Sequence, residues 1–175
     1  MIESQRSGEI VLKLCVLSHP DELAIDFIKK LVTENQGQST EFEALGVSIA
    51  TIKVHFDDKR IKIVLLRTNG QEFFKKLRSS YKNTSGAIIF FTKENPDSFE
   101  KARQFYHFFC KIVNDPVVPV TFMDVIDSSK EILFVDPEEA EDGQTLYYEL
   151  NMDDIQAFVK ILKIIASKYL ASFEE

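Results

Sequence analysis

Two kinds of hydrophobic pattern alternate along this chain. Residues 10–17 form a largely apolar run that predicts a strand, and residues 21–35 place apolar side chains four residues apart. The pairs at this spacing are Phe27 with Leu31 and Ile28 with Val32. Such spacing gathers apolar side chains on one face of a helix. Pro20 suits the first turn of that helix because its φ is already close to the helical value.

The middle of the chain predicts a hairpin followed by buried strands. Apolar and polar residues alternate over residues 50–56, the chain turns at Asp57-Asp58, and apolar residues return at alternate positions over residues 61–65. Alternation of this kind is typical of half-buried antiparallel strands. Residues 86–92 and 117–123 are short continuous apolar runs, as expected for central strands covered on both faces.

The last part of the chain predicts a helix, a strand and a closing helix. The first helix carries apolar residues at intervals of three, four and seven, which we interpret as core packing rather than a binding stripe. These residues are Phe99, Tyr106, Phe109 and Val113. Residues 145–150 predict a strand, and residues 155–169 predict a helix whose start is favoured by Asp153 and Asp154.

Strands that alternate with helices predict an α/β protein. We expect a doubly wound, mostly parallel six-stranded sheet with helices on both faces and one antiparallel hairpin. We predict a single domain over residues 10–172, preceded by a tail at residues 1–9. A chain of 175 residues that is 45% hydrophobic is long enough to bury one sizeable core.

Charge and composition exclude several functional classes. A formal charge of −7 disfavours nucleic acid as a partner. Two isolated cysteines and three scattered histidines predict neither a disulfide framework nor a metal site. The apolar runs are too short to span a bilayer, and the chain ends in Ala171-Ser172-Phe173-Glu174-Glu175, without a prenylation cysteine. We therefore expect a cytoplasmic protein without a lipid anchor or transmembrane segment.

Short matches to one protein family follow one another in order between residues 13 and 122. They are Lys13-Leu14-Cys15-Val16-Leu17, Leu45-Gly46-Val47, Gly70-Gln71-Glu72-Phe73-Phe74 and Gly86-Ala87-Ile88-Ile89-Phe90-Phe91. In that order they resemble the first strand, the switch I exit, the switch II segment and the fourth strand of small GTPases of the Rab type. The resemblance implies a small GTPase fold and directs attention to its nucleotide site.

The resemblance assigns the phosphate loop to residues 18–25. Small GTPases carry glycines there, so that backbone N–H groups surround the phosphates, and a Gly-Lys-Ser sequence that binds phosphate and magnesium. This chain has Leu23-Ala24-Ile25 in place of Gly-Lys-Ser, no glycine in the loop, and a Pro20 without an N–H group. Asp21 and Glu22 add negative charge that would repel a polyphosphate.

Other nucleotide contacts that the resemblance implies are also replaced. Ala44 stands where the switch I threonine would bind magnesium, and Arg67 stands where an aspartate would associate with the metal. The guanine-recognition sequence is replaced by Met123-Asp124-Val125-Ile126-Asp127, in which Asp127 is at most a displaced remnant. The degenerate nucleotide site thus comprises Ser18, Leu23, Ala24, Ile25, Ala44 and Arg67. Gln71 matches the residue that orients the attacking water, and we interpret it as a remnant rather than a catalytic residue.

These replacements predict a pseudo-GTPase: a Rab-like fold with no cofactor, no metal and no GTP hydrolysis. It would act as a protein-interaction module or complex subunit, and the resemblance implies a role in membrane traffic. The partner surface that the resemblance implies comprises Leu45, Val47, Phe73, Phe74, Leu77 and Tyr81. For the three residues Phe73, Phe74 and Leu77, simple coverage of the core remains open as a second interpretation.

Two further hypotheses concern Arg67 and one concerns an acidic run. Arg67 could form an internal ion pair with Asp21 or Glu22 at the vacant phosphate position. Alternatively, the chain is an atypical nucleotide-binding switch in which Arg67 contacts phosphate, since the guanidinium group suits phosphate geometry. The acidic residues over positions 136–142 fit a solvated segment, or a docking site for a basic partner.

Overall fold

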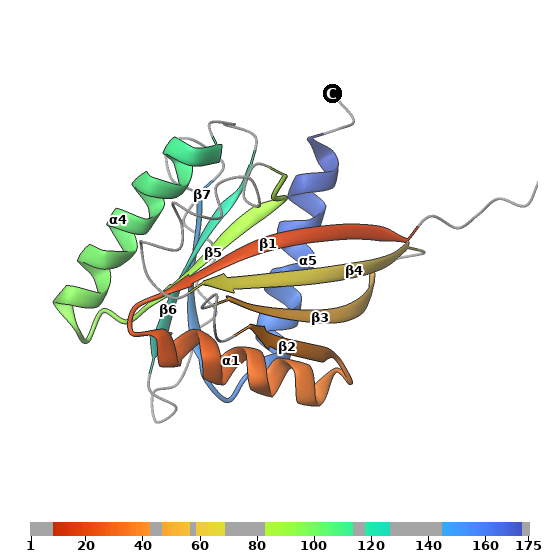
Figure 1. The fold of residues 1–175 in the computed structure, drawn as a ribbon, viewed down its shortest axis with the longest axis horizontal. Helices are drawn as coiled ribbons and strands as arrows, with labels where there is room; N and C mark the ends of the chain where they lie inside the picture. The colour runs from red at the N-terminus through yellow and green to blue at the C-terminus, as the bar shows by residue number, and fades with distance from the viewer. Residues whose placement is uncertain are drawn as a thin grey trace, which may run out of the picture.

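The chain folds into a single sheet with helices on both faces. The computed structural model describes residues 9–42, 47–56, 59–68, 83–113, 118–126 and 145–172. Within these residues the sheet has seven strands in the order β2-β3-β4-β1-β5-β6-β7 (Figure 1). They are β1 (Ile10–Ser18), β2 (Gln38–Phe42), β3 (Val47–Phe56), β4 (Lys59–Thr68), β5 (Gly86–Phe91), β6 (Val120–Ile126) and β7 (Thr145–Asn151).

Most of the strand pairs are parallel. β1 pairs in parallel with β4 on one side and with β5 on the other, and β6 and β7 continue the parallel part of the sheet. β3 is antiparallel to both of its neighbours, β2 and β4. The predicted fold class, a doubly wound and mostly parallel α/β sheet, is confirmed.

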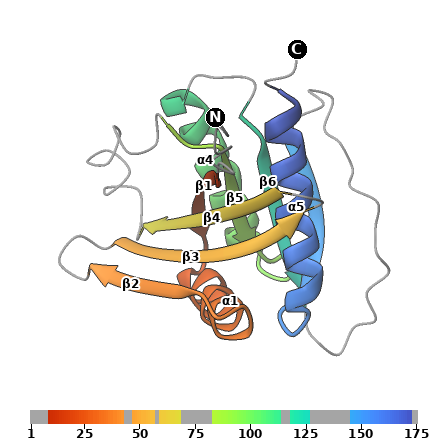
Figure 2. The same ribbon diagram turned by 90° about the vertical axis from the view of Figure 1, so that its right-hand side faces the viewer.

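Three helices among the described residues cover the two faces of the sheet: α1 (Asp21–Glu34), α4 (Pro96–Val113) and α5 (Ile155–Ala171). The buried residues of α1 and α5 belong to one hydrophobic cluster, and those of α4 belong to another. Figures 1 and 2 show α4 (green) and α5 (blue) on opposite sides of β5 and β6. The molecule is therefore built in three layers.

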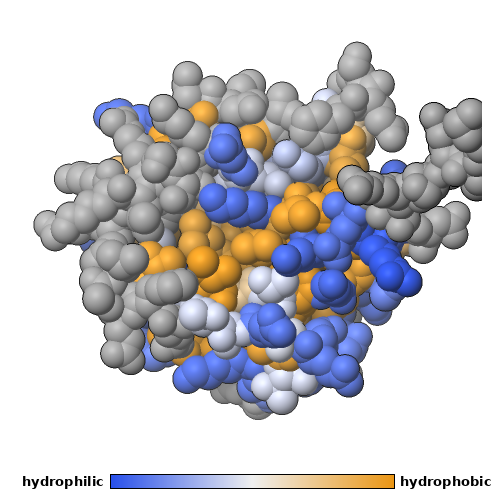
Figure 3. Space-filling view, turned by 45° about the vertical axis from the view of Figure 1, so that its right-hand side comes forward, coloured by the Kyte–Doolittle hydropathy of each residue, from blue (hydrophilic) through white to orange (hydrophobic). Residues whose placement is uncertain are grey.

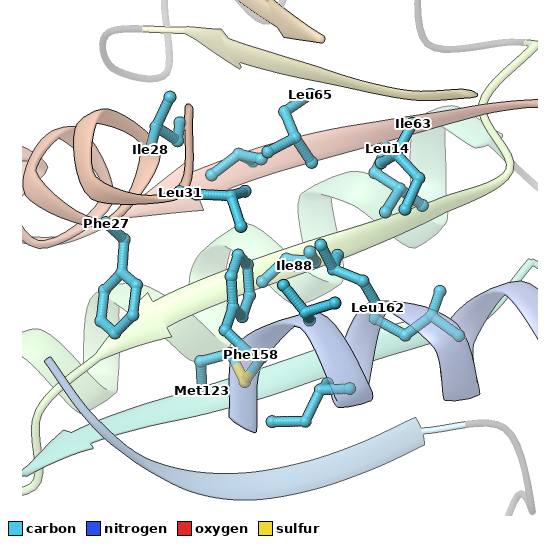
Figure 4. Packing of buried hydrophobic residues seen from close by; sticks show 14 of the residues in the cluster. Leu14, Phe27, Ile28, Leu31, Ile63, Leu65, Ile88, Met123, Phe158 and Leu162 are labelled. Carbon is cyan, nitrogen blue, oxygen red and sulfur yellow. The ribbon is translucent and has the colours of Figure 1, made fainter. Parts of the chain in front are cut away.

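The larger core lies between the sheet and the pair α1 and α5. Figure 4 shows Phe27 of α1 and Phe158 of α5 pointing into the same space beside Met123 of β6. Phe27, Phe90 and Phe158 are each at most 1% exposed, and their ring centroids lie 5.3–5.8 Å apart. This group of three rings joins both helices to β5.

The helix starts follow the sequence. Pro20 is the N-cap of α1, which begins at Asp21, and Asp154 is the N-cap of α5. The Asp154 carboxylate accepts a hydrogen bond from the Ala157 N–H at 2.9 Å and so satisfies one of the free donors at the helix start. The start of the closing helix after Asp154 is therefore confirmed.

The prediction of six strands and one antiparallel hairpin misses β2, which pairs antiparallel with β3 at the sheet edge. The side chains of Gln38, Ser39 and Thr40 are all exposed, so the strand carries no apolar alternation that would reveal it. Gly37 permits the close approach of this segment, because a Cβ there would lie 2.6 Å from the Thr51 carbonyl oxygen. Over Gln38, Ser39 and Thr40, the strand is held by backbone pairing rather than by side-chain burial.

The core stripe of α4 also differs from the prediction. Phe109 is buried as expected, but Phe99 is 42% exposed and Tyr106 and Val113 are only partly buried. The helix buries instead Ser98, Ala102, Phe105, Phe109 and Ile112. The helix is thus rotated relative to the predicted stripe. The Phe99 ring is tilted against that of the buried Phe91, at a centroid distance of 5.3 Å.

Candidate functional site

The candidate site lies at the carboxyl ends of β1 and β5. β1 continues into α1 on one face of the sheet, and β5 continues into α4 on the other face, so the winding reverses between these adjacent strands. In doubly wound sheets this switch point forms the crevice in which ligands bind. The groups at this switch point therefore decide whether a ligand fits there.

Hydrogen bonds of the chain itself join the elements that meet at this switch point. The loop between β1 and α1 consists of His19 and Pro20, and its one backbone N–H, that of His19, donates to the Phe90 carbonyl oxygen at 3.2 Å. The fully buried Ser98 hydroxyl donates to the His19 carbonyl oxygen and accepts from the Thr92 N–H at 3.0 Å. The loop is thereby joined to the end of β5 and to the start of α4.

The start of α1 is closed in a similar way. The buried Ser18 hydroxyl donates to the Pro20 carbonyl oxygen at 2.6 Å and accepts from the Ala24 N–H at 3.3 Å. The Leu23 N–H donates to the Pro20 carbonyl oxygen at 3.3 Å. Backbone N–H groups at a helix start are the usual phosphate ligands in nucleotide-binding loops. Here those of Leu23 and Ala24 bind acceptors of the chain.

The residues in place of Gly-Lys-Ser face the core or its edge. Ala24 is fully buried, Leu23 packs against the larger core cluster, and Ile25 is partly buried. A phosphate in the crevice would therefore meet apolar side chains and the carboxylates of Asp21 and Glu22, which already lie in the first turn of the helix. These residues do not fit a magnesium–triphosphate group.

Arg67 lies beside this loop, near the end of β4. It is 7% exposed, and its Nε donates to the Ser48 hydroxyl of β3 at 3.2 Å. Its positive charge also acts on the acidic start of α1. Burial raises the pKa of Asp21 above its ordinary value of 3.8 and Glu22 adds to this rise, while Arg67 and His19 oppose it.

The raised pKa of Asp21 predicts how stability depends on pH. The folded protein binds the Asp21 proton more tightly than the unfolded chain, so this group favours folding below pH 3.8 and loses that contribution as pH rises through the raised pKa. We expect Asp21→Asn to raise the free energy of unfolding at neutral pH, with a gain that shrinks as pH falls toward 3.8. Urea unfolding across this range measures the effect, with Glu22→Gln as the matched control.

The opposite pH trend for Asp21→Asn would contradict this assignment. A variant that loses stability only above the carboxyl pKa would mean that the charged Asp21 is held by a favourable partner. Glu22, which is exposed and adjacent, controls for the general effect of removing one negative charge from the helix start.

A second buried polar cluster lies at the ends of β6 and β7, where the resemblance places base recognition. Asp124 is 1% exposed, and its carboxylate accepts hydrogen bonds from the Lys93 N–H at 2.9 Å and the Tyr147 hydroxyl at 2.8 Å. The Lys93 ammonium lies 3.5 Å from Asp124 and 3.7 Å from Glu149, and 4.6 Å above the Tyr147 ring. This cluster holds the loop after β5 against β6 and β7.

Sequence patterns alone do not mark Asp124, Lys93, Tyr147 or Ser98 as residues with a role in the site. Asp124 gives a usable signal, because a carboxylate inside an apolar strand requires partners when it is buried. Ser98 gives none, since serine is common near helix starts. Both become visible only when the topology brings β5, β6 and α4 together.

Several predicted site residues lie outside the described residues. They are Ala44, Leu45, Gln71, Phe73, Phe74, Leu77, Tyr81 and Asp127. Val47 is described and is 8% exposed, because it packs in the cluster beneath α4. Val47 therefore contributes little surface to a partner site.

In the described part of the chain, no three histidine, cysteine or acidic side chains gather to hold a metal ion. No helix among those residues has the length and apolar character to cross a bilayer.

Comparison with known proteins gives matches to Ras and Ras-related proteins. The sequence model described as the Ras family matches residues 23–164. Ras-related protein Rab-21 of Mus musculus is 28% identical over 99 residues, which are 56% of this chain and 45% of that protein. Ras-related protein Rab-21 of Rattus norvegicus is 28% identical over 99 residues, or 44% of its length. The match thus spans less than half the length of either relative.

Proposed function

Because the chain belongs to the Ras family, we propose that it is a nucleotide-independent member of that family, a pseudo-GTPase that acts as a protein-interaction module. The observation that carries this proposal is the start of α1, where the Leu23 N–H donates to the Pro20 carbonyl oxygen and the Ala24 N–H donates to the Ser18 hydroxyl. Backbone donors that would bind phosphate at a helix start are thus bound to the chain itself.

Three other features support the proposal. The family match begins at Leu23, so β1 and the loop after it lie outside the matched residues. Arg67 brings positive charge to the position where the resemblance implies a metal, and two carboxylates begin α1. The buried Asp124 cluster fills the position of base recognition with contacts among the chain's own residues.

In this proposal, hydrogen bonds within the chain hold the loops that a bound nucleotide would otherwise order. In GTP-dependent switches, the γ-phosphate and magnesium order the loops that contact partners. Arg67 lowers the pKa of Asp21 by less than burial raises it. We therefore propose that the hydrogen bonds of Ser18 and Ser98 order the start of α1 and the loop before it without a nucleotide. The partner would then be bound constitutively, in the cytoplasm, through the surface assigned to Phe73, Phe74 and Leu77, with a role in membrane traffic.

A second candidate function follows from Arg67. A buried guanidinium beside the crevice could contact a phosphate in an altered pose, since arginine binds phosphate through two N–H groups. In that case the chain would be an atypical nucleotide-dependent switch. Partner binding would then change with the nucleotide.

The two functions predict different partner binding. We expect the tagged protein to capture the same partners, in the same amounts, whether a non-hydrolysable GTP analogue with magnesium or EDTA is present, since nothing in the proposal depends on a ligand. Quantitative mass spectrometry of the captured proteins measures this. Phe74→Ala should remove those partners, and Phe99→Ala, an exposed phenylalanine on α4, is the matched control.

The nucleotide-dependent candidate makes the contrary prediction. A partner set that appears only with the GTP analogue and magnesium, and is lost with Arg67→Met, would overturn the pseudo-GTPase proposal. Retention of all partners by Phe74→Ala would instead leave nucleotide independence intact and reject the assigned surface.

A further inference from the structure

The outer half of the β3–β4 hairpin places basic side chains opposite one another. In the antiparallel register Lys53 pairs with Lys62, and His55 pairs with Arg60. Residues in register point to the same face of a sheet. The intervening residues, Ile52, Val54, Ile61 and Ile63, are buried beneath α1 and α5. The four basic side chains therefore share the opposite face.

β1 continues this surface. Val11 lies in register with Lys62 and is 54% exposed, and Lys13 lies in register with Val64, which is partly buried. Figure 3 shows this side of the molecule, with hydrophobic side chains across the middle and hydrophilic side chains gathered at the right. We call Lys13, Lys53, His55, Arg60 and Lys62, together with Val11, the hairpin face.

One ion pair on the hairpin face is described. Lys53 pairs with Glu9 at 3.2 Å, and both side chains are largely solvent-exposed. Among the described residues, neither Arg60 nor Lys62 makes an ion pair. Like charges placed directly opposite one another destabilise an antiparallel pair. Among the described residues, Arg60 and Lys62 thus add positive charge without an ion-pair partner, in a chain whose formal charge is −7.

From this charge distribution we infer that the hairpin face is a docking surface for an acidic segment of another protein. Glu9 already shows how a carboxylate lies on this face, against Lys53. Same-face residues along a strand lie about 6.6–6.8 Å apart, which matches carboxylates at alternate positions of an extended segment. The inference does not depend on whether the protein binds nucleotide.

The net negative charge of the protein favours an acidic protein segment over a membrane or a nucleic acid as the partner. A membrane or a nucleic acid presents many negative charges to the whole protein and would be repelled by the remaining acidic surface. A short acidic segment interacts mainly within about 8 Å, the screening distance at physiological salt, and so responds to the local basic cluster. The hairpin face therefore favours an acidic protein segment over either large polyanion.

The test uses a fluorescent peptide in which glutamate alternates with serine, and measures its binding to the full chain by anisotropy. We expect binding that weakens as salt rises, and no binding of a matched peptide with glutamine in place of glutamate. The double variant Arg60→Glu and Lys62→Glu should reduce affinity at least about tenfold. The control variant Lys29→Glu and Lys101→Glu makes the same change in net charge on exposed helix positions and should stay within about twofold.

The unfolding temperature of the double variant gives a second readout. If Arg60 and Lys62 only stabilised the fold, replacing them would lower this temperature. Lys62→Glu places an acid opposite Lys53, and Arg60→Glu places one opposite His55, so we expect the double variant to unfold at a higher temperature than the native chain. Loss of binding together with a gain in stability supports the docking surface. Four results would overturn the inference. The native chain does not bind the glutamate peptide, or the double variant and the control variant bind it equally. The native chain prefers vesicles containing phosphatidylserine, or the double variant unfolds at a lower temperature than the native chain.

Discussion

Phe158→Ala is expected to lower the free energy of unfolding by about 3–5 kcal/mol, the range for removing a fully buried aromatic side chain. Phe158 is 1% exposed, and its ring lies 5.5 Å from that of Phe27 and 5.8 Å from that of Phe90. The substitution would leave a cavity between α1, α5 and β5. Urea denaturation followed by circular dichroism measures the loss.

The cavity left by Phe158→Ala lies in the cluster formed by Phe27, Phe90 and Phe158, so we expect a large loss of stability. Phe90 also supplies the carbonyl oxygen that accepts from the His19 N–H, so the ring cluster is joined through the backbone to the loop between β1 and α1. Phe99→Ala is the matched control, because Phe99 has a ring contact with Phe91 but is 42% exposed. Equal losses for the two variants would contradict the assignment of Phe158 to the centre of the core.

Asp124→Ala is expected to lower the free energy of unfolding by about 2–4 kcal/mol, since hydrogen bonds to a charged group contribute about 1.5–3 kcal/mol each and are not additive between neighbours. The variant would leave the Lys93 N–H and the Tyr147 hydroxyl without their acceptor, and the Lys93 ammonium without its nearer carboxylate. Thermal and urea unfolding measure the stability.

Tyr147→Phe tests one hydrogen bond of the Asp124 carboxylate separately from the other contacts of the cluster. It removes only the hydroxyl bond at 2.8 Å and keeps the ring beneath Lys93, so we expect a loss of about 1–2 kcal/mol. An Asp124→Ala variant as stable as the native chain would mean that water satisfies these donors. The cluster would then not hold the loop after β5 in place.

Patterned elements could be predicted because their burial alternates or repeats. The apolar face of α1 and the run from Gly86 to Phe91 have the periods of a covered helix and a covered strand, and both are found as predicted. β2 could not be predicted, because its first three residues are polar and exposed and pair with β3 through the backbone, which leaves no apolar alternation in the sequence. Phe99 shows the opposite error, in which an aromatic residue fits a helical stripe but lies at the edge of the core.

The candidate site could be predicted only in part. The replacements at Leu23, Ala24 and Arg67 are visible in the sequence because a resemblance fixes what should stand there. The replacement contacts are not visible, since the bonds from Ser98 to His19 and from Tyr147 to Asp124 join residues 79 and 23 positions apart. Only the fold brings such partners together.

We predict that guanine nucleotides do not bind this protein. Nanomolar binding corresponds to about 12 kcal/mol, and each charge-assisted contact to a ligand contributes about 1.5–3 kcal/mol, so losing several of them removes most of the affinity. Isothermal titration calorimetry of the purified, nucleotide-free chain with GTP and GDP, with and without magnesium, tests this directly. We predict no binding heat up to about millimolar nucleotide. Saturable binding at micromolar or lower concentration, weakened by Arg67→Met, would contradict the account and establish a nucleotide-dependent switch.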